Sequence, residues 1–302
     1  MNTKTQTPNQ TPNTIETIID VDAFLAGNDV QEQQLEQTGF RRIQHFNESP
    51  YHRGTVIAQG GYGIKDEDES APDIGKRETV KHLGGNSSIM RCAQQIEIAL
   101  IGFSPRYFTV EYDDPADSTN RVRLIVSRYI SPDQLPGANG RCRSAMSYFV
   151  ALKAEEKRQL WELTFKGFNV EDAVRVVGQA KYFAQQAAKY IREKTNKIVT
   201  PHTFMLWLPL GVGESRMVGK DEQSPVTPPV LKLAADADVS KFFVSGDDFC
   251  TFLELRKQLD EYLATGRYNG ASPQQLVALP APRALPASNG NGNGMPDDDI
   301  PF

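Results

Sequence analysis

The chain has 302 residues, of which 39% are hydrophobic, so it is long enough to bury a substantial core. Lys and Arg number 33 against 38 Asp and Glu, and the resulting net charge of −5 excludes a uniformly basic nucleic-acid binder. No run approaches the roughly 20 apolar residues of a membrane span, and residues 1–14 lack the apolar centre of a signal peptide. We therefore expect no membrane association and a cytoplasmic location.

The first half of the chain is predicted to be rich in strands. Residues 1–14 are typical of a disordered leader, and residues 15–25 of a short helix. Strands are predicted over 53–59 and 76–83, and a helix over 86–100 with Asn86 near its cap. The clearest hairpin joins 106–112 to 121–130, because both runs are aromatic and β-branched and turn residues separate them.

The second half is predicted to be mainly helical. Helices are expected over 144–163, over 170–194 with Asn169 as the cap, and over 245–263, where Ser245 and Asp248 have capping-box spacing. Short strands are expected over 204–208 and 230–233. The predicted fold class is α+β, with a strand-rich N-terminal half, a helical C-terminal half and disordered ends. The body spans 15–268, and a sub-boundary near residue 135 stays open.

Cations gather in the middle of the chain. Between residues 121 and 197, fifteen Lys and Arg stand against seven Asp and Glu, a net charge of +8, so the remainder carries −13. Tyrosines are interleaved with these cations, and rings that stack on bases beside cations that follow phosphates are typical of single-strand binding. A solvated helix face and half-buried strand tyrosines remain the alternative. The candidate DNA-binding residues are Arg121, Arg123, Arg128, Tyr129, Arg141, Arg143, Tyr148, Arg175, Tyr182 and Lys189.

Sequence signatures of catalysis and metal binding are weak. The glycines of 60–63 lack the Lys-Ser/Thr ending of a phosphate loop, and the four histidines show no metal-ligand spacing. Cys92, Cys142 and Cys250 form no Cys-x-x-Cys pair, which favours a reducing compartment. Carboxylates in 66–69 and 113–114 fall in expected loops. We expect no enzymatic activity, no cofactor and no metal.

The C-terminus carries the most specific motif. Residues 269–296 are rich in Gly, Asn and Pro, which is typical of a flexible tether. The last six residues are Asp297, Asp298, Asp299, Ile300, Pro301 and Phe302. This tether and tip closely resemble the C-terminal end of bacterial single-stranded DNA-binding protein. The resemblance covers about a tenth of the chain and does not extend to that family's oligonucleotide-binding barrel. It implies that the tip binds an apolar pocket with a basic rim on host replication and repair proteins.

The leading hypothesis is a non-catalytic protein that binds single-stranded DNA during replication or recombination and recruits genome-maintenance enzymes through its tip. An adaptor or decoy that captures host replication proteins without binding DNA is the alternative, and a recombination nuclease is a weaker one. A familiar tip on an unfamiliar body suggests a phage, plasmid or other mobile element. The partner protein, DNA versus RNA, a homo-oligomeric state and closure of the strands into a barrel stay open.

Overall fold

The computed structural model describes residues 40–265 apart from 67–68, 83–85, 116–120, 127, 136 and 220–223. The leader, the expected 15–25 helix, the tether and the tip lie outside these residues. The described strands are β1 (Arg41–Phe46), β2 (Gly61–Lys65), β3 (Lys76–Lys81), β4 (Ser87–Ala93), β5 (Gln95–Phe103), β6 (Tyr107–Asp113), β7 (Arg121–Val126), β8 (Arg141–Leu152), β9 (Trp161–Lys166), β10 (Leu208–Val212), β11 (Arg216–Val218), β12 (Ser224–Val226) and β13 (Pro229–Leu231). The described α-helices are α2 (Asn169–Thr195) and α3 (Gly246–Thr265), and short 3-10 helices cover Pro50–His52, Pro132–Gln134, Thr203–Met205 and Val239–Phe242.

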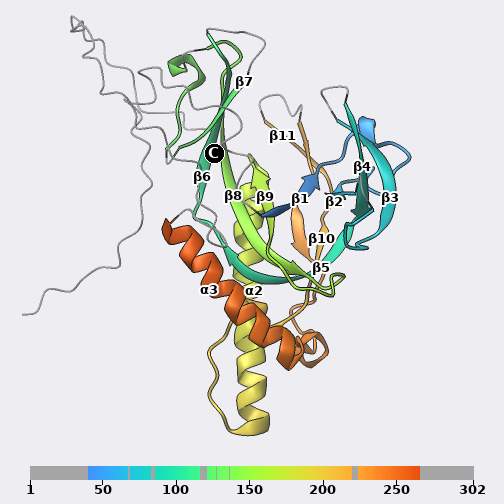
Figure 1. Cartoon of the computed structure of the whole chain (residues 1–302), viewed down its shortest axis with the longest axis vertical. Coiled ribbons are helices and arrows are strands. Elements are labelled where there is room, and N and C mark those ends of the chain that lie inside the picture. Colours follow the sequence, from blue (N-terminus) through green and yellow to red (C-terminus); the bar gives the residue numbers. More distant parts are fainter. Residues whose placement is uncertain are drawn as a thin grey trace, which may run out of the picture.

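One sheet of eleven strands organises the described chain (Figure 1). Its main path runs β13-β10-β5-β8-β9-β1-β2-β4-β3, and β6 and β7 branch from β8. The β8 strand is twelve residues long, so its second half pairs with β5 while its first half pairs with β6. Strands β11 and β12 form a separate two-stranded ribbon. Strands β5 and β6 precede residue 135, and both pair with β8, which follows it. The sheet therefore continues across the sub-boundary considered near residue 135.

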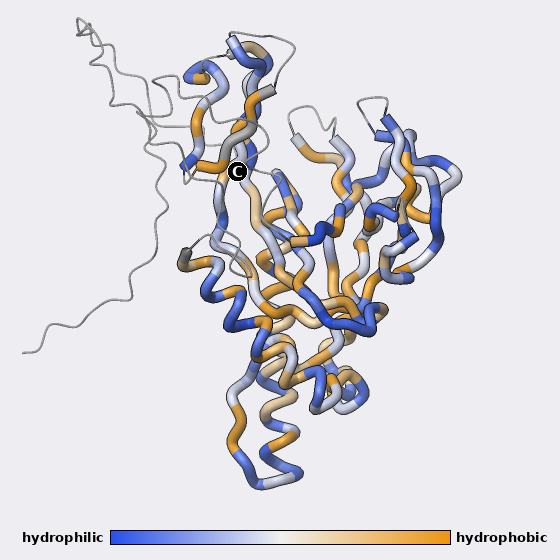
Figure 2. The backbone as a smooth tube through the Cα atoms, in the orientation of Figure 1, coloured by the Kyte–Doolittle hydropathy of each residue, from blue (hydrophilic) through white to orange (hydrophobic). Residues whose placement is uncertain are grey.

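The two helices cover opposite faces of the central strands. Alternate residues of β8, such as Tyr148 and Val150, share a core cluster with α2, whereas Phe149 and Ala151 share one with α3. Figure 2 shows the hydrophobic stretches of the central strands and the alternation of hydrophobic and hydrophilic residues along α3. Where α3 crosses β5, a Cβ on Gly102 would approach Leu259 Cδ2 to 2.5 Å. A side chain at this close approach would therefore force Leu259 to shift.

The predicted α+β class is confirmed, with strands dominating the first half and the helices following later. The hairpin is confirmed as β6 and β7, which pair antiparallel, and the 76–83 strand as β3. The helices over 170–194 and 245–263 are confirmed as α2 and α3, and Ser245 Oγ accepts the Asp248 N–H at 3.0 Å. The cap of α2 is corrected: Phe168 occupies the N-cap position, and Asn169 is the first helical residue.

Four other predictions are wrong. Residues 86–100 form β4 and most of β5, and 144–163 falls in β8 and β9, so the sheet extends well past residue 141. From Ile98 in β5 and from Ala145 in β8 both faces are buried, so these stretches do not show the alternation of a half-exposed strand. Residues 53–59 form successive turns rather than a strand, with Gly54 at φ +87°. At 204–208 a 3-10 turn comes first, and β10 begins only at Leu208.

No helix in the described part of the chain is long and apolar enough to cross a membrane.

A buried carboxylate joins the β3–β4 edge of the sheet to the loop after β2. The Asp66 side chain is inaccessible to solvent, and its Oδ2 lies 2.9 Å from Arg91 Nε and 3.2 Å from Arg77 Nε. Its Oδ1 accepts the Ala71 N–H at 3.0 Å. Burial opposes ionisation of Asp66, but the Ala71 amide and the two guanidinium groups outweigh it and lower the pKa.

We predict that Asp66→Asn lowers the free energy of unfolding at pH 7 by about 1.5–3 kcal/mol, because hydrogen bonds to a charged group are lost. A carboxyl with a lowered folded-state pKa stabilises the fold above its ordinary value of 3.8 and loses this contribution as the pH falls through the folded value. Urea unfolding between pH 7 and pH 3 measures the difference between variant and parent. A difference that stays constant down to pH 3 would contradict this role.

Candidate nucleic-acid interface

Strands β6, β7 and the first four residues of β8 form a three-stranded extension of the sheet, which we call the arm. It projects past the start of α2 (Figure 1). The strand register places Arg123, Glu111 and Arg141 in one row across the three strands, and Ile125, Thr109 and Arg143 in the next. Directly opposed residues of antiparallel strands share a face. Two consecutive rows of the arm therefore bring charged and polar positions together.

The two faces of the arm differ in character. On one face Val110, Tyr112 and Val126 pack against Ile130 and Leu135 from the segment that follows β7. This small core closes that side. Arg141 and Arg143 alternate with Cys142 of the closed face, and both are exposed. They share the strand parity of Phe149, which packs toward α3, so the polar face of the arm lies on the α3 side of the sheet.

A polar network continues this face onto β9 and β1. Ser147 Oγ lies 2.8 Å from Glu162 Oε1 and 2.9 Å from both Tyr107 Oη and Thr164 Oγ1. Arg42 Nε is 3.8 Å from the other Glu162 oxygen. Burial raises the pKa of Tyr107, so its hydroxyl stays protonated and can donate. These hydrogen bonds hold the polar side chains of β6, β8 and β9 in fixed positions on this face.

Three arginines of the arm region have no carboxylate partner. Within the described residues, the side chains of Arg128, Arg141 and Arg143 form no ion pair or hydrogen bond, and all three are exposed. Beside Arg128, the ring of Tyr129 is 58% exposed. Among the described aromatic rings it contacts Phe108 edge-on at 6.1 Å, and Phe108 packs against the small core of the closed face. Unpaired cations and an open ring are the groups that bind phosphates and stack on bases.

The candidates on α2 lie apart from the arm. Helix α2 packs on the opposite face of the sheet from α3, and Arg175, Tyr182 and Lys189 follow its exposed stripe. Arg175 Nη1 is 3.2 Å from Asp172, and Lys189 Nζ is 3.9 Å from Glu193. Tyr182 borders a hollow of about 330 Å³ whose far wall includes two aspartates, Asp236 and Asp238. The structure therefore divides the candidates that the sequence grouped together.

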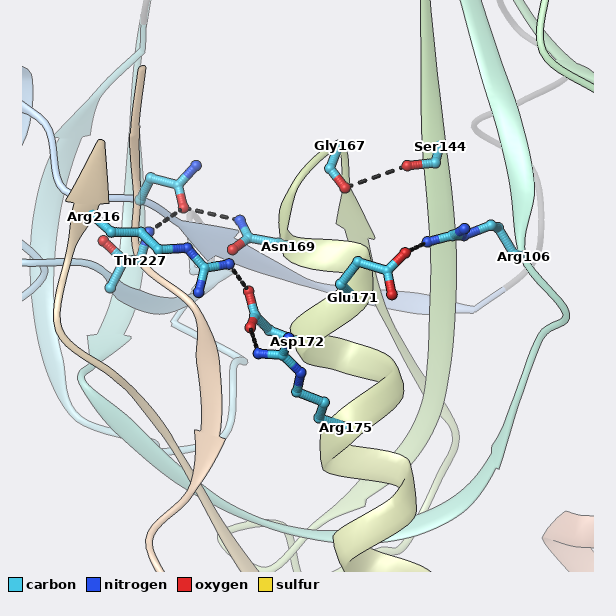
Figure 3. Close-up of polar contacts among 10 residues, drawn as sticks. Arg106, Ser144, Gly167, Asn169, Glu171, Asp172, Arg175, Arg216 and Thr227 are labelled. Carbon is cyan, nitrogen blue, oxygen red and sulfur yellow. Dashed lines mark hydrogen bonds and ion pairs between the residues drawn. The ribbon is translucent and has the colours of Figure 1, made fainter. Parts of the chain in front are cut away.

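The start of α2 is held by a cluster of polar contacts (Figure 3). Arg106 pairs with Glu171, and Asp172 pairs with both Arg175 and Arg216, the latter at 2.6 Å. The arginines of this cluster thus bind carboxylates of the first helical turn. They position α2 rather than offer free charge.

The same cluster ties α2 to β1 and to the end of β12. Asn47 Oδ1 accepts from Asn169 Nδ2 at 2.9 Å and from the Thr227 N–H at 3.0 Å. On the other side, Ser144 Oγ donates to the Gly167 carbonyl at 3.3 Å (Figure 3). The helix start is therefore fixed between β8 and the β1–β12 region, next to the base of the arm.

The proposed base platform at Tyr148 is wrong. Its side chain is fully buried, its ring packs on Phe165 at 4.9 Å between centroids, and its hydroxyl donates to the Ala173 carbonyl. The backbone of Arg121 and Arg123 lies in β7, opposite Asp113 and Glu111. Asp297, Asp298, Asp299, Ile300, Pro301 and Phe302 lie outside the described residues.

Two cations on the α3-side face were missed by the sequence analysis. Lys166 ends β9 opposite Ala145, and Arg42 lies in β1 beside Glu162; both are exposed. Alternation of polar and apolar residues over 161–166 and 41–46 could have indicated half-exposed strands. The helix predicted over 144–163 obscured the first of these patterns.

Comparisons with known proteins give no relative for this chain. No family model, no curated protein and no solved structure matches it. Within the described residues, no group of three or more His, Cys, Asp or Glu is arranged to hold a metal ion. His45 packs against Tyr62 and Phe165, and burial lowers its pKa to about 4, so it is a neutral core residue at physiological pH.

Proposed function

We propose that the protein binds single-stranded DNA along the polar face of the arm, without catalysis or a cofactor, and recruits genome-maintenance enzymes through residues 297–302. The observation that carries the DNA-binding part is the set of exposed arginines Arg128, Arg141 and Arg143, which have no carboxylate partner in the described chain. In a chain of net charge −5, unpaired cations gathered on one strand set are a specific feature. The proposal places the protein in the cytoplasm.

The geometry favours a single strand over a duplex. Arg141 and Arg143 project from one face of a strand, about 6.8 Å apart along it, which suits an extended backbone lying across the sheet. A single strand has unstacked bases, and a strand that passes around the edge of the arm can stack one of them on the exposed ring of Tyr129, which lies on the side of Phe108.

The adaptor or decoy remains the second candidate. The pairing of Arg175 and Lys189 with carboxylates supports it, because the cationic surface is smaller than the sequence indicated. In that case the tip alone carries the function. The recombination nuclease has no specific observation in its favour.

We predict that Arg141→Glu/Arg143→Glu weakens binding of a labelled oligo-dT at least tenfold at 50 mM salt. It also reduces the slope of log affinity against log salt by about 1.4, since each neutralised phosphate of a single strand contributes about 0.7. The matched control is Lys153→Glu/Lys157→Glu, which makes the same charge change where the chain leaves the other end of β8. Fluorescence anisotropy measures both. Equal loss in the two variants would show that the arm is not the binding surface, and no binding by the parent protein would favour the adaptor.

We predict that Tyr129→Ala lowers single-strand affinity by about 1–3 kcal/mol, the usual contribution of one stacked base. The comparison is Tyr148→Phe, which removes a buried hydroxyl and leaves the affinity unchanged. Anisotropy at fixed salt gives both values. Unchanged binding by Tyr129→Ala would remove this ring from the interface and leave only the arginines.

We predict that removing Phe302 abolishes capture of a tip-binding replication enzyme while single-strand affinity stays the same, because the apolar anchor is lost. Replacing Asp297, Asp298 and Asp299 with Asn instead slows association, since rim charges act on encounter. Pull-down and surface plasmon resonance distinguish the two effects. Capture that survives the loss of Phe302 would make the resemblance of the tip coincidental.

A further inference from the structure

An apolar groove lies between the end of α2 and the start of α3. Its volume is about 440 Å³, and most of its walls are hydrophobic. Beside it, Ile198 is 87% exposed. The lining residues include Ile191, Val199, Met205, Phe243, Phe249 and Leu253. An open apolar groove next to a fully exposed isoleucine is the type of surface that binds another apolar segment.

A basic segment borders one side of this groove, and the start of α3 on its other side carries the exposed acid Asp247. The last turn of α2 and the loop after it carry Arg192, Lys194 and Lys197 against the single carboxylate Glu193, and all four are exposed. Glu193 is itself 3.9 Å from Lys189. An apolar segment with acidic residues therefore fits the groove better than a neutral or basic one.

Residues 15–25 of the same chain have this character. Seven of these eleven residues are apolar, namely Ile15, Ile18, Ile19, Val21, Ala23, Phe24 and Leu25. The charged residues are three acids, Glu16, Asp20 and Asp22. At helical spacing, Ile15, Ile18 and Leu25 fall on one side together with Asp22, and Glu16 and Asp20 fall on the other together with Phe24. The apolar residues at 276–279 near the other end are followed by Arg283 and have no nearby acid, so they fit the basic side less well.

The connecting chain is long enough. Phe40, where the description begins, packs on Tyr262 of α3 with ring centroids 4.7 Å apart. Leu253 of the groove is nine residues earlier on α3, or about 14 Å at the helical rise of 1.5 Å per residue. The fourteen residues 26–39 have a root-mean-square span of about 21 Å as a flexible coil. The linker thus covers the distance without being stretched.

We propose that residues 15–25 bind in this groove in cis, as an apolar segment whose acids face the basic side. Tethering by a short linker gives an effective concentration in the millimolar range, so an intrinsic dissociation constant of about 0.1 mM is enough for nine-tenths occupancy. The bound segment covers Ile198 and bridges the end of α2 to α3.

Cys250 provides a native probe for the test. It is exposed on α3 next to Phe249, whereas Cys92 is buried and Cys142 is half-buried. Burial raises the pKa of Cys92 to about 12 and also raises that of Cys142, so a thiol-reactive, polarity-sensitive dye labels Cys250 selectively. In the full chain, Ile18→Glu/Phe24→Glu is expected to shift the emission to the red. Thr14→Glu/Thr17→Glu, with the same charge change, is expected to leave it unchanged.

Addition of a synthetic peptide of residues 13–27 to the Ile18→Glu/Phe24→Glu variant is expected to restore the emission. An unchanged spectrum for that variant would overturn the proposal. A red shift on deleting residues 297–302 would assign the groove to the C-terminal tip and overturn it as well. An emission that depends on protein concentration would show binding to a second copy and overturn the cis arrangement.

Discussion

Burial of β5 and β8 on both faces is the constraint on which the rest of the structure depends. Each strand sends alternate side chains into the α2 core and into the α3 core, so neither helix can move without exposing one side of the same two strands. The fully buried Tyr148 and Phe165 lie on the α2 side, and Phe252 and Leu259 on the α3 side. Burying a large apolar side chain contributes about 1.5–3 kcal/mol, so these paired cores position both helices firmly.

The same strand supplies the candidate interface. Beyond the helices, β8 continues for several residues with its parity unchanged, and the α3-side positions that hold Phe149 and Ala151 in the core hold Arg141 and Arg143 in the arm. The buried part of β8 therefore sets the direction in which these arginines project. The small core around Val110 and Ile130 closes the opposite side and keeps the arm from folding onto itself.

The sequence predicted those elements that have one buried face. The β6–β7 hairpin and helices α2 and α3 each alternate or repeat in polarity, and their positions were correct. The second halves of β5 and β8 lack such a pattern because both faces are buried, and the apolar spacing of β4 matched a helix equally well. The error carried over to the site: Tyr148 was taken as exposed, and Lys166 was missed. The arginines of the arm were found because charge density does not depend on the type of secondary structure.

Existing ion pairs determine which cations are available to bind the phosphates of a DNA strand. Arg175 and Lys189 would have to exchange a carboxylate for a phosphate, so their net gain on binding is small. Within the described residues Arg141 and Arg143 have no such partner, and like charges separated by the roughly 7 Å between these strand positions repel by on the order of 0.6 kcal/mol in water. A phosphate placed between them adds two attractions at shorter distance, which outweigh this repulsion. The arm should therefore bind a strand before the face of α2 does, although the sequence assigns both to one basic block.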